Sequence, residues 1–165
     1  MDATWKTMIW RQFGAAIQMI ENAIEACPDD LWGDRTRNPQ FWYMVCHALF
    51  YLDLYLSESL DGFAPPPPFT RAEMDPDAPL PEQAYSKSQA RAYLEHGRKK
   101  CKTTIEAFTE ERARRRCGFY WLEMTDAELL LYNMRHVQHH AAQLNLILRQ
   151  TIDSAPGWVA LAKST

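Results

Sequence analysis

The sequence lacks several features that would place it in a common class of protein. No apolar run is long enough to cross a membrane, and the opening MDATWKTMIW lacks the charged and apolar regions of a signal peptide. The 18 basic and 21 acidic residues give a net charge of −3, without the basic excess that nucleic-acid-binding proteins usually carry. We therefore expect a cytoplasmic protein with no nucleic-acid partner and no membrane partner.

The chain also lacks a cysteine pattern typical of disulfide-rich or cysteine-rich zinc proteins. Its four cysteines, Cys27, Cys46, Cys101 and Cys117, are scattered and form no CxxC pair. These spacings argue against a zinc site made mainly of cysteine, and we expect free thiols in a reducing compartment.

The sequence also has no internal repeat, and it has no β-strand pattern bounded by the turn residues of a hairpin. Apolar residues instead recur at spacings of three and four, which predicts helices. The predicted helices span approximately residues 4–26, 39–61, 87–110 and 126–152. A chain of 165 residues suits one domain, so we expect a single all-α domain over residues 1–165, a four-helix bundle.

Capping residues mark the ends of these helices. Asn38 and Pro39 suit the N-cap and the first position of the second helix, and Gly62 suits its C-terminal end. Two capping boxes, in which a hydroxyl residue precedes a Gln or Glu by three positions, begin the third and fourth helices: Ser86 with Gln89, and Thr125 with Glu128.

The connections have their own signals. Residues 62–82 hold seven of the ten prolines and cannot form a regular helix, so we expect a long ordered crossover between the second and third helices. The run DDLW after Pro28 has the pattern of a short helical turn, and the apolar Trp158, Val159 and Leu161 predict that the C-terminal tail docks on another part of the molecule.

Three of the five histidines, His136, His139 and His140, lie within a stretch of five residues in the fourth predicted helix. His136 and His140 have the i, i+4 spacing that puts two imidazoles on one helix face, where they can bind one metal ion. His139 follows His136 by three positions, so spacing alone does not decide between His139 and His140. His47, in the apolar second helix, would be costly to bury unpaired, and an ion shared with the fourth helix would satisfy it.

Each histidine signal also has a structural interpretation. A lone core histidine is more often hydrogen-bonded to the backbone, and a histidine pair on a helix is often a surface feature. Together, in a predicted bundle, they favour a metal site. Three imidazoles suit zinc, nickel or iron and leave a coordination position open for water or substrate. No residue stands out as a dedicated general base, although His139 is a candidate if it faces the pocket, and the sequence does not identify the catalytic residues.

The order of these elements resembles the DinB superfamily. A histidine midway along the second helix, a long crossover and then HVQHHAAQ, from His136 to Gln143, carry the resemblance. It implies that His47, His136 and His140 are the metal ligands and that His139 lies outside the first coordination shell. This chain has Ala141 and Ala142 where the family usually has Arg-Gly before the glutamine.

The resemblance also implies a range of functions. The family comprises metal-binding four-helix bundles, often homodimers, and includes metal-dependent thiol transferases that use low-molecular-weight thiols, an isomerase and hydrolase-like members. We therefore expect a homodimeric, metal-dependent enzyme, a thiol S-transferase or a hydrolase, that acts on a small molecule. Its divalent ion would be zinc or nickel, with iron as a further candidate, and would activate a thiol or a water. The alternative is a non-catalytic metal-binding or stress-related bundle.

Overall fold

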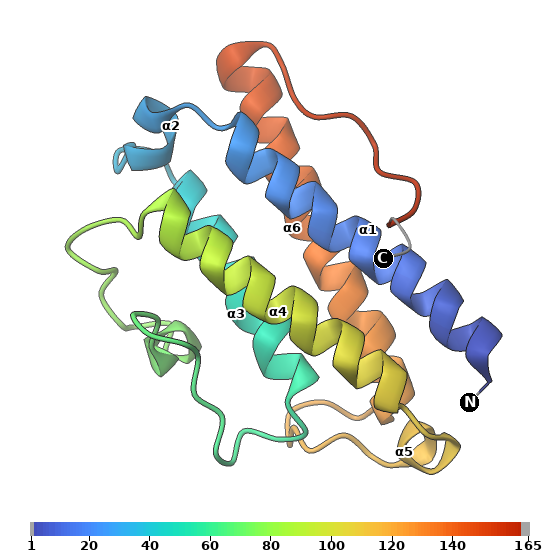
Figure 1. The fold of residues 1–165 in the computed structure, drawn as a ribbon. Coiled ribbons are helices and arrows are strands. Elements are labelled where there is room, and N and C mark those ends of the chain that lie inside the picture. The colour runs from blue at the N-terminus through green and yellow to red at the C-terminus, as the bar shows by residue number, and fades with distance from the viewer. Residues whose placement is uncertain (1, 163–165) are drawn as a thin grey trace.

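The computed structural model describes residues 2–162, which are mostly helical (Figure 1). Over these residues it has six α-helices, one 3₁₀ helix and no β-strand, only two isolated β-bridges. The long helices are α1 (Ala3–Ala26), α3 (Phe41–Leu56), α4 (Lys87–Ala107) and α6 (Asp126–Ile152). The short ones are α2 (Asp29–Gly33), α5 (Glu110–Arg114) and the 3₁₀ helix η1 (Arg71–Met74). The all-α prediction is confirmed and the four predicted long helices are present, but the described residues form six α-helices in all because short helices also form in the connections.

The long helices pack around one apolar core. Helices α1 and α3 each contact both α4 and α6. The core is filled by large side chains with less than 2% exposure, among them Phe13 and Ile17 of α1, Trp42 of α3 and Tyr93 of α4. Gly97 allows α4 to approach α3 closely, because a Cβ at this position would lie 2.8 Å from Cδ2 of Leu52. Within the described residues no helix is long and apolar enough to span a membrane.

Helix α3 is shorter at both ends than predicted. Its N-cap is Gln40, whose extended backbone puts the first helical residue at Phe41 rather than at Pro39. It ends at Leu56 rather than near Gly62. The Asp53 carbonyl accepts hydrogen bonds from Nζ of Lys100 and Oγ of Ser57, at 2.9 and 3.2 Å. Lys100 of α4 thus donates to a carbonyl that would accept a hydrogen bond from a backbone N–H if the helix continued.

The predicted third helix is interrupted after Ala107. Phe108 has an extended backbone, and Thr109 caps the new helix α5 by accepting a hydrogen bond from the backbone N–H of Arg112. Both predicted capping boxes are present at the starts of α4 and α6. The short turn predicted at DDLW is present as α2.

Residues 57–86 connect α3 to α4 and contain η1. Aromatic contacts attach this connection to the core: the ring of Phe69 lies 4.5 Å from the rings of both Tyr85 and Tyr93, measured between centroids. Nη1 of Arg35 donates to the carbonyls of Pro81 and Glu82, at 2.9 and 2.7 Å. These contacts position η1 beside α3.

The C-terminal segment, residues 153–162, runs back beside α1 (Figure 1). The backbone N–H of Ala162 donates to the carbonyl of Arg11 at 2.8 Å, and Nδ2 of Asn145 donates to the carbonyl of Pro156 at 3.5 Å. Val159 packs against the core. The prediction that this tail docks on the rest of the molecule is therefore confirmed.

Candidate metal centre

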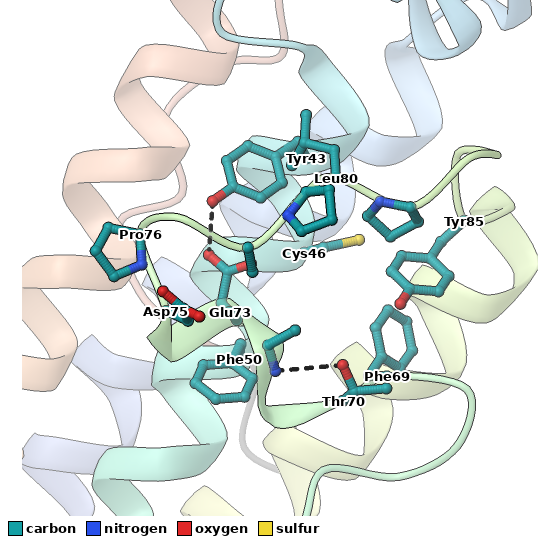
Figure 2. Close-up of a pocket in the computed structure, with 14 residues that line it drawn as sticks. Tyr43, Cys46, Phe50, Phe69, Thr70, Glu73, Asp75, Pro76, Leu80 and Tyr85 are labelled. Carbon is teal, nitrogen blue, oxygen red and sulfur yellow. Dashed lines mark hydrogen bonds between the residues drawn. The ribbon is translucent and has the colours of Figure 1, made fainter.

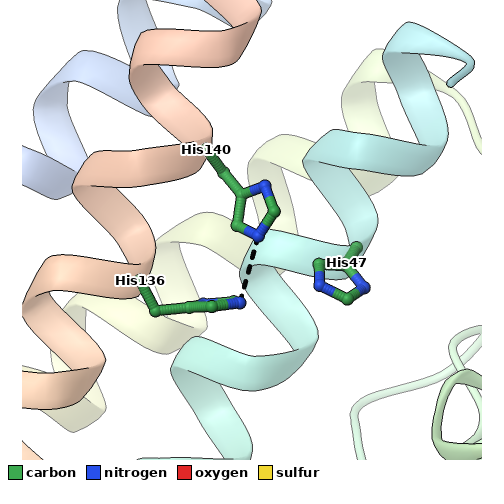
Figure 3. A group of neighbouring side chains, drawn as sticks. All are labelled: His47, His136 and His140. Atoms are coloured by element: carbon green, nitrogen blue, oxygen red, sulfur yellow. Dashed lines mark hydrogen bonds between the residues drawn. The ribbon is translucent and has the colours of Figure 1, made fainter.

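His47 from α3 and His136 and His140 from α6 point toward one another (Figure 3). Nε2 of His136 and Nε2 of His140 are 3.1 Å apart. The centroid of the His47 ring lies 5.5 Å from that of His136 and 4.8 Å from that of His140. One nitrogen from each ring lies within 4.8 Å of the other two. The fold thus gathers side chains that are 89 positions apart in sequence (47 to 136).

The environment keeps the two α6 imidazoles neutral at neutral pH. Burial is the largest cause that lowers the pKa of His136, to about 3, and the neighbouring imidazoles of His140 and His47 lower it further. Burial and the charge of His47 lower the pKa of His140 to about 4, and the neighbouring Gln143 side chain opposes this shift. A neutral imidazole keeps a lone pair on one nitrogen, which is the form that binds a metal ion.

The arrangement fits a divalent ion. Ligand nitrogens at about 2.0–2.1 Å from a tetrahedral ion lie roughly 3.3 Å apart. The 3.1 Å between the two α6 nitrogens is close to this separation, and the His47 ring supplies a third nitrogen on the same side. Among the described residues no further His, Cys, Asp or Glu belongs to the group. Three protein ligands leave a coordination position for water or substrate.

Glu73 of η1 contacts the third histidine from outside the group. Its Oε1 lies 2.6 Å from Nδ1 of His47 and accepts a hydrogen bond from the Tyr43 hydroxyl at 3.1 Å. A carboxylate only accepts, so Nδ1 carries the proton and the lone pair of His47 is on Nε2. Glu73 thereby sets the tautomer and the ring orientation of His47.

Glu73 could not be identified from the sequence. It lies 26 positions from His47, in the proline-rich connection, where no helical spacing relates the two residues. Glu73 and Tyr43 also line a small hollow between α3 and the connection (Figure 2). The hollow has a volume of about 240 Å³, below the roughly 300–1,000 Å³ of typical ligand pockets.

Aromatic rings pack around the histidines. The Tyr51 ring lies 4.8 Å from the ring of His47 and 5.4 Å from that of His136, measured between centroids. Tyr55 lies 6.3 Å from His136 and 5.5 Å from Tyr132. Burial raises the pKa of the Tyr51 and Tyr55 hydroxyls. The rings of Tyr51, Tyr55 and Tyr132 thus exclude water from the α3–α6 side of the site.

The other polar residues of α6 divide between the site and the core. The exposed His139 is not part of the three-nitrogen group, although its ring lies 5.2 Å from that of His140. Oε1 of Gln143 is buried without a hydrogen-bond partner in the described part of the chain, beside His140. Asn133 is fully buried and donates to the carbonyl of Leu52 at 3.0 Å, so it joins α6 to α3.

Comparison with known proteins adds one finding to this geometry. A family model described as the DinB superfamily matches residues 12–144, well over half of the 165-residue chain. Searches of curated proteins and of solved structures found no match. The matched range includes the three histidines and Glu73. The chain belongs to the DinB superfamily.

Proposed function

We propose that this protein is a metal-dependent enzyme that uses a three-histidine site to activate a thiol or a water, for thiol transfer or hydrolysis. The observation that carries the proposal is the convergence of three imidazole nitrogens, with no fourth ligand of the His, Cys, Asp or Glu type among the described residues. A closed site with four protein ligands is typical of a structural ion, whereas three ligands are typical of a reactive one.

Each residue has a role that follows from its position. His47, His136 and His140 would hold the ion, and imidazole ligands favour zinc or nickel, with iron as a further candidate. The ion would act as a Lewis acid that lowers the pKa of a bound water or thiol. Glu73 fixes the orientation of His47 through the 2.6 Å contact. Tyr51 and Tyr55 shield the site from water on one side.

Replacement of Glu73 by glutamine should weaken metal binding by roughly 10- to 100-fold, the usual effect of losing a carboxylate that supports a histidine ligand. Glutamine keeps the shape of the side chain but removes its charge. The dissociation constant can be measured by competition with a chromophoric chelator. Glu82→Gln is the matched control, because Glu82 is an exposed carboxylate of the same connection. Equal affinities for the two variants would show that Glu73 does not support the site.

The proposed chemistry can be tested with cobalt(II) in place of the native ion. Addition of 2-mercaptoethanol should produce the near-ultraviolet absorption that accompanies coordination of a sulfur to cobalt, and metal-free protein should show no change. The metal-loaded protein should then accelerate the reaction of a thiol with an electrophile such as monobromobimane, or the hydrolysis of an activated ester. A protein that binds the ion but has neither activity would support the non-catalytic alternative.

A further inference from the structure

A second hollow lies between α1, α6 and the C-terminal segment, and we call it the α1–α6 groove. It has a volume of about 600 Å³, which is in the range of small-molecule sites. Its walls come from α1, from α6 and from the C-terminal segment, and its polar lining residues include Gln12, Arg135 and His139. His136 and Tyr132 also line it, so the groove adjoins the metal centre.

The third wall of the groove is held in place by specific contacts. The C-terminal segment is fixed by hydrogen bonds at Pro156 and Ala162, and Val159 packs on the core between them. Gly14 of α1 makes the close approach possible, because a Cβ there would lie 2.7 Å from Cβ of Ala162. The neighbouring Trp158 lines the groove while 71% of its surface is exposed.

The lining residues carry positive charge without acidic neighbours. Among the described residues, no Asp or Glu lines the groove. Arg135 is exposed and has no hydrogen-bond or ion-pair partner within residues 2–162. Some other arginines of the chain are paired with carboxylates; Nε of Arg115, for example, donates to Oδ2 of Asp126 at 2.8 Å. An unpaired guanidinium at a groove presents the planar fork of donors that binds a carboxylate through two hydrogen bonds.

The remaining surface of the groove suits an apolar body. Ala15, Ala16, Ala142 and Val159 contribute small apolar side chains, and the indole of Trp158 offers a flat face for stacking. A ligand with one negative charge and an aromatic or aliphatic body would satisfy both parts of the lining. A polyanion without an apolar body would leave the indole and the alanine surface unused.

We propose that the α1–α6 groove binds a small organic carboxylate with an aromatic or apolar body, through Arg135 and Trp158. The binding depends only on the groove residues and does not need a metal ion. Its further role rests on the proposed function: because His136 borders both sites, the groove would hold the carboxylate end of the substrate or thiol that reacts at the metal centre.

Titration calorimetry of the full chain with 3-phenylpropionate tests this proposal, with the neutral 3-phenylpropanamide as a second probe. Both are measured on metal-loaded protein and on chelator-treated protein. We expect the carboxylate to bind in both forms and at least ten-fold more tightly than the amide. Arg135→Gln should remove this preference for the carboxylate, and Trp158→Ala should weaken the binding of both probes. Arg149→Gln is the matched control, since Arg149 is exposed on the same helix, 14 residues further on.

The outcomes separate this inference from the proposed function. Carboxylate binding that survives chelation and is lost in Arg135→Gln supports the groove even if no activity is found. No binding to either form, or an unchanged preference in Arg135→Gln, overturns the inference and leaves the metal centre untouched. If Arg149→Gln lost as much affinity for the carboxylate as Arg135→Gln, the inference would also be overturned, because attraction to the overall charge of α6 would then explain the binding.

Discussion

Alanine in place of His47, His136 or His140 should reduce the metal content of the protein from about one ion per chain to nearly none. Removal of a direct ligand should cost more affinity than the roughly 10- to 100-fold loss from an outer-shell change. The two remaining imidazoles would bind the ion weakly at neutral pH, although the low pKa values of His136 and His140 keep them unprotonated. Plasma mass spectrometry on untagged, reconstituted protein measures the content directly.

His139→Ala is the matched control for these variants. His139 lies on the same helix, between the two proposed ligands, but its side chain is exposed and outside the three-nitrogen group. It should keep the metal content of the wild type. If His139→Ala lost the ion while His140→Ala retained it, the assignment of His140 as the ligand would be wrong. Circular dichroism of each variant separates loss of the site from loss of the fold.

Lys100→Met should lower the free energy of unfolding by about 3 kcal/mol, at the low end of the range for breaking a buried ion pair. Asp53 is 1% exposed, and Nζ of Lys100 lies 2.5 Å from its Oδ1. Without the lysine, the carboxylate's remaining side-chain partners in the described part of the chain are the hydroxyl of Tyr93 and Nε2 of His96, at 3.2 and 3.3 Å. The carbonyl of Asp53, in the last turn of α3, also loses a donor. Urea denaturation of metal-free protein measures this change.

Lys99→Met provides the comparison, because the side chain of Lys99 is 77% exposed and its Nζ lies 3.7 Å from Oε1 of Glu95. Its loss should change stability by less than about 1 kcal/mol. The double variant Asp53→Asn with Lys100→Met should be less destabilised than Lys100→Met alone, since both partners of the pair are then removed. If Lys99→Met and Lys100→Met lowered the free energy of unfolding by similar amounts, the buried Asp53–Lys100 pair would have no special role in stability.

Much of the fold follows from local patterns in the sequence. Apolar spacing identifies the four long helices, and the starts of α4 and α6 coincide with the two capping boxes because a hydroxyl and an amide or carboxylate three residues later satisfy the first N–H groups. The ends of α3 could not be predicted in this way. Its C-terminus is set by Lys100, a residue of another helix, so it depends on tertiary contact.

In the candidate site, too, local patterns indicate some residues, whereas others depend on tertiary contacts. The spacing of His136 and His140 and the apolar setting of His47 pointed to the three side chains that the fold brings together. Spacing could not choose between His139 and His140, since both lie within one turn of His136. Glu73 and the α1–α6 groove depend on segments that pack from a distance, the η1 connection and the C-terminal tail, and no periodic signal links either to the histidines.

The most direct test of this account is a crystal structure of the zinc-reconstituted protein with anomalous diffraction collected on both sides of the zinc absorption edge. We predict one strong anomalous peak at about 2.0–2.1 Å from Nε2 of His47, His136 and His140, with at least one further position occupied by solvent. A peak that involves His139 in place of His140 would correct the ligand set. Fully loaded crystals without a peak between α3 and α6 would contradict the proposed metal centre.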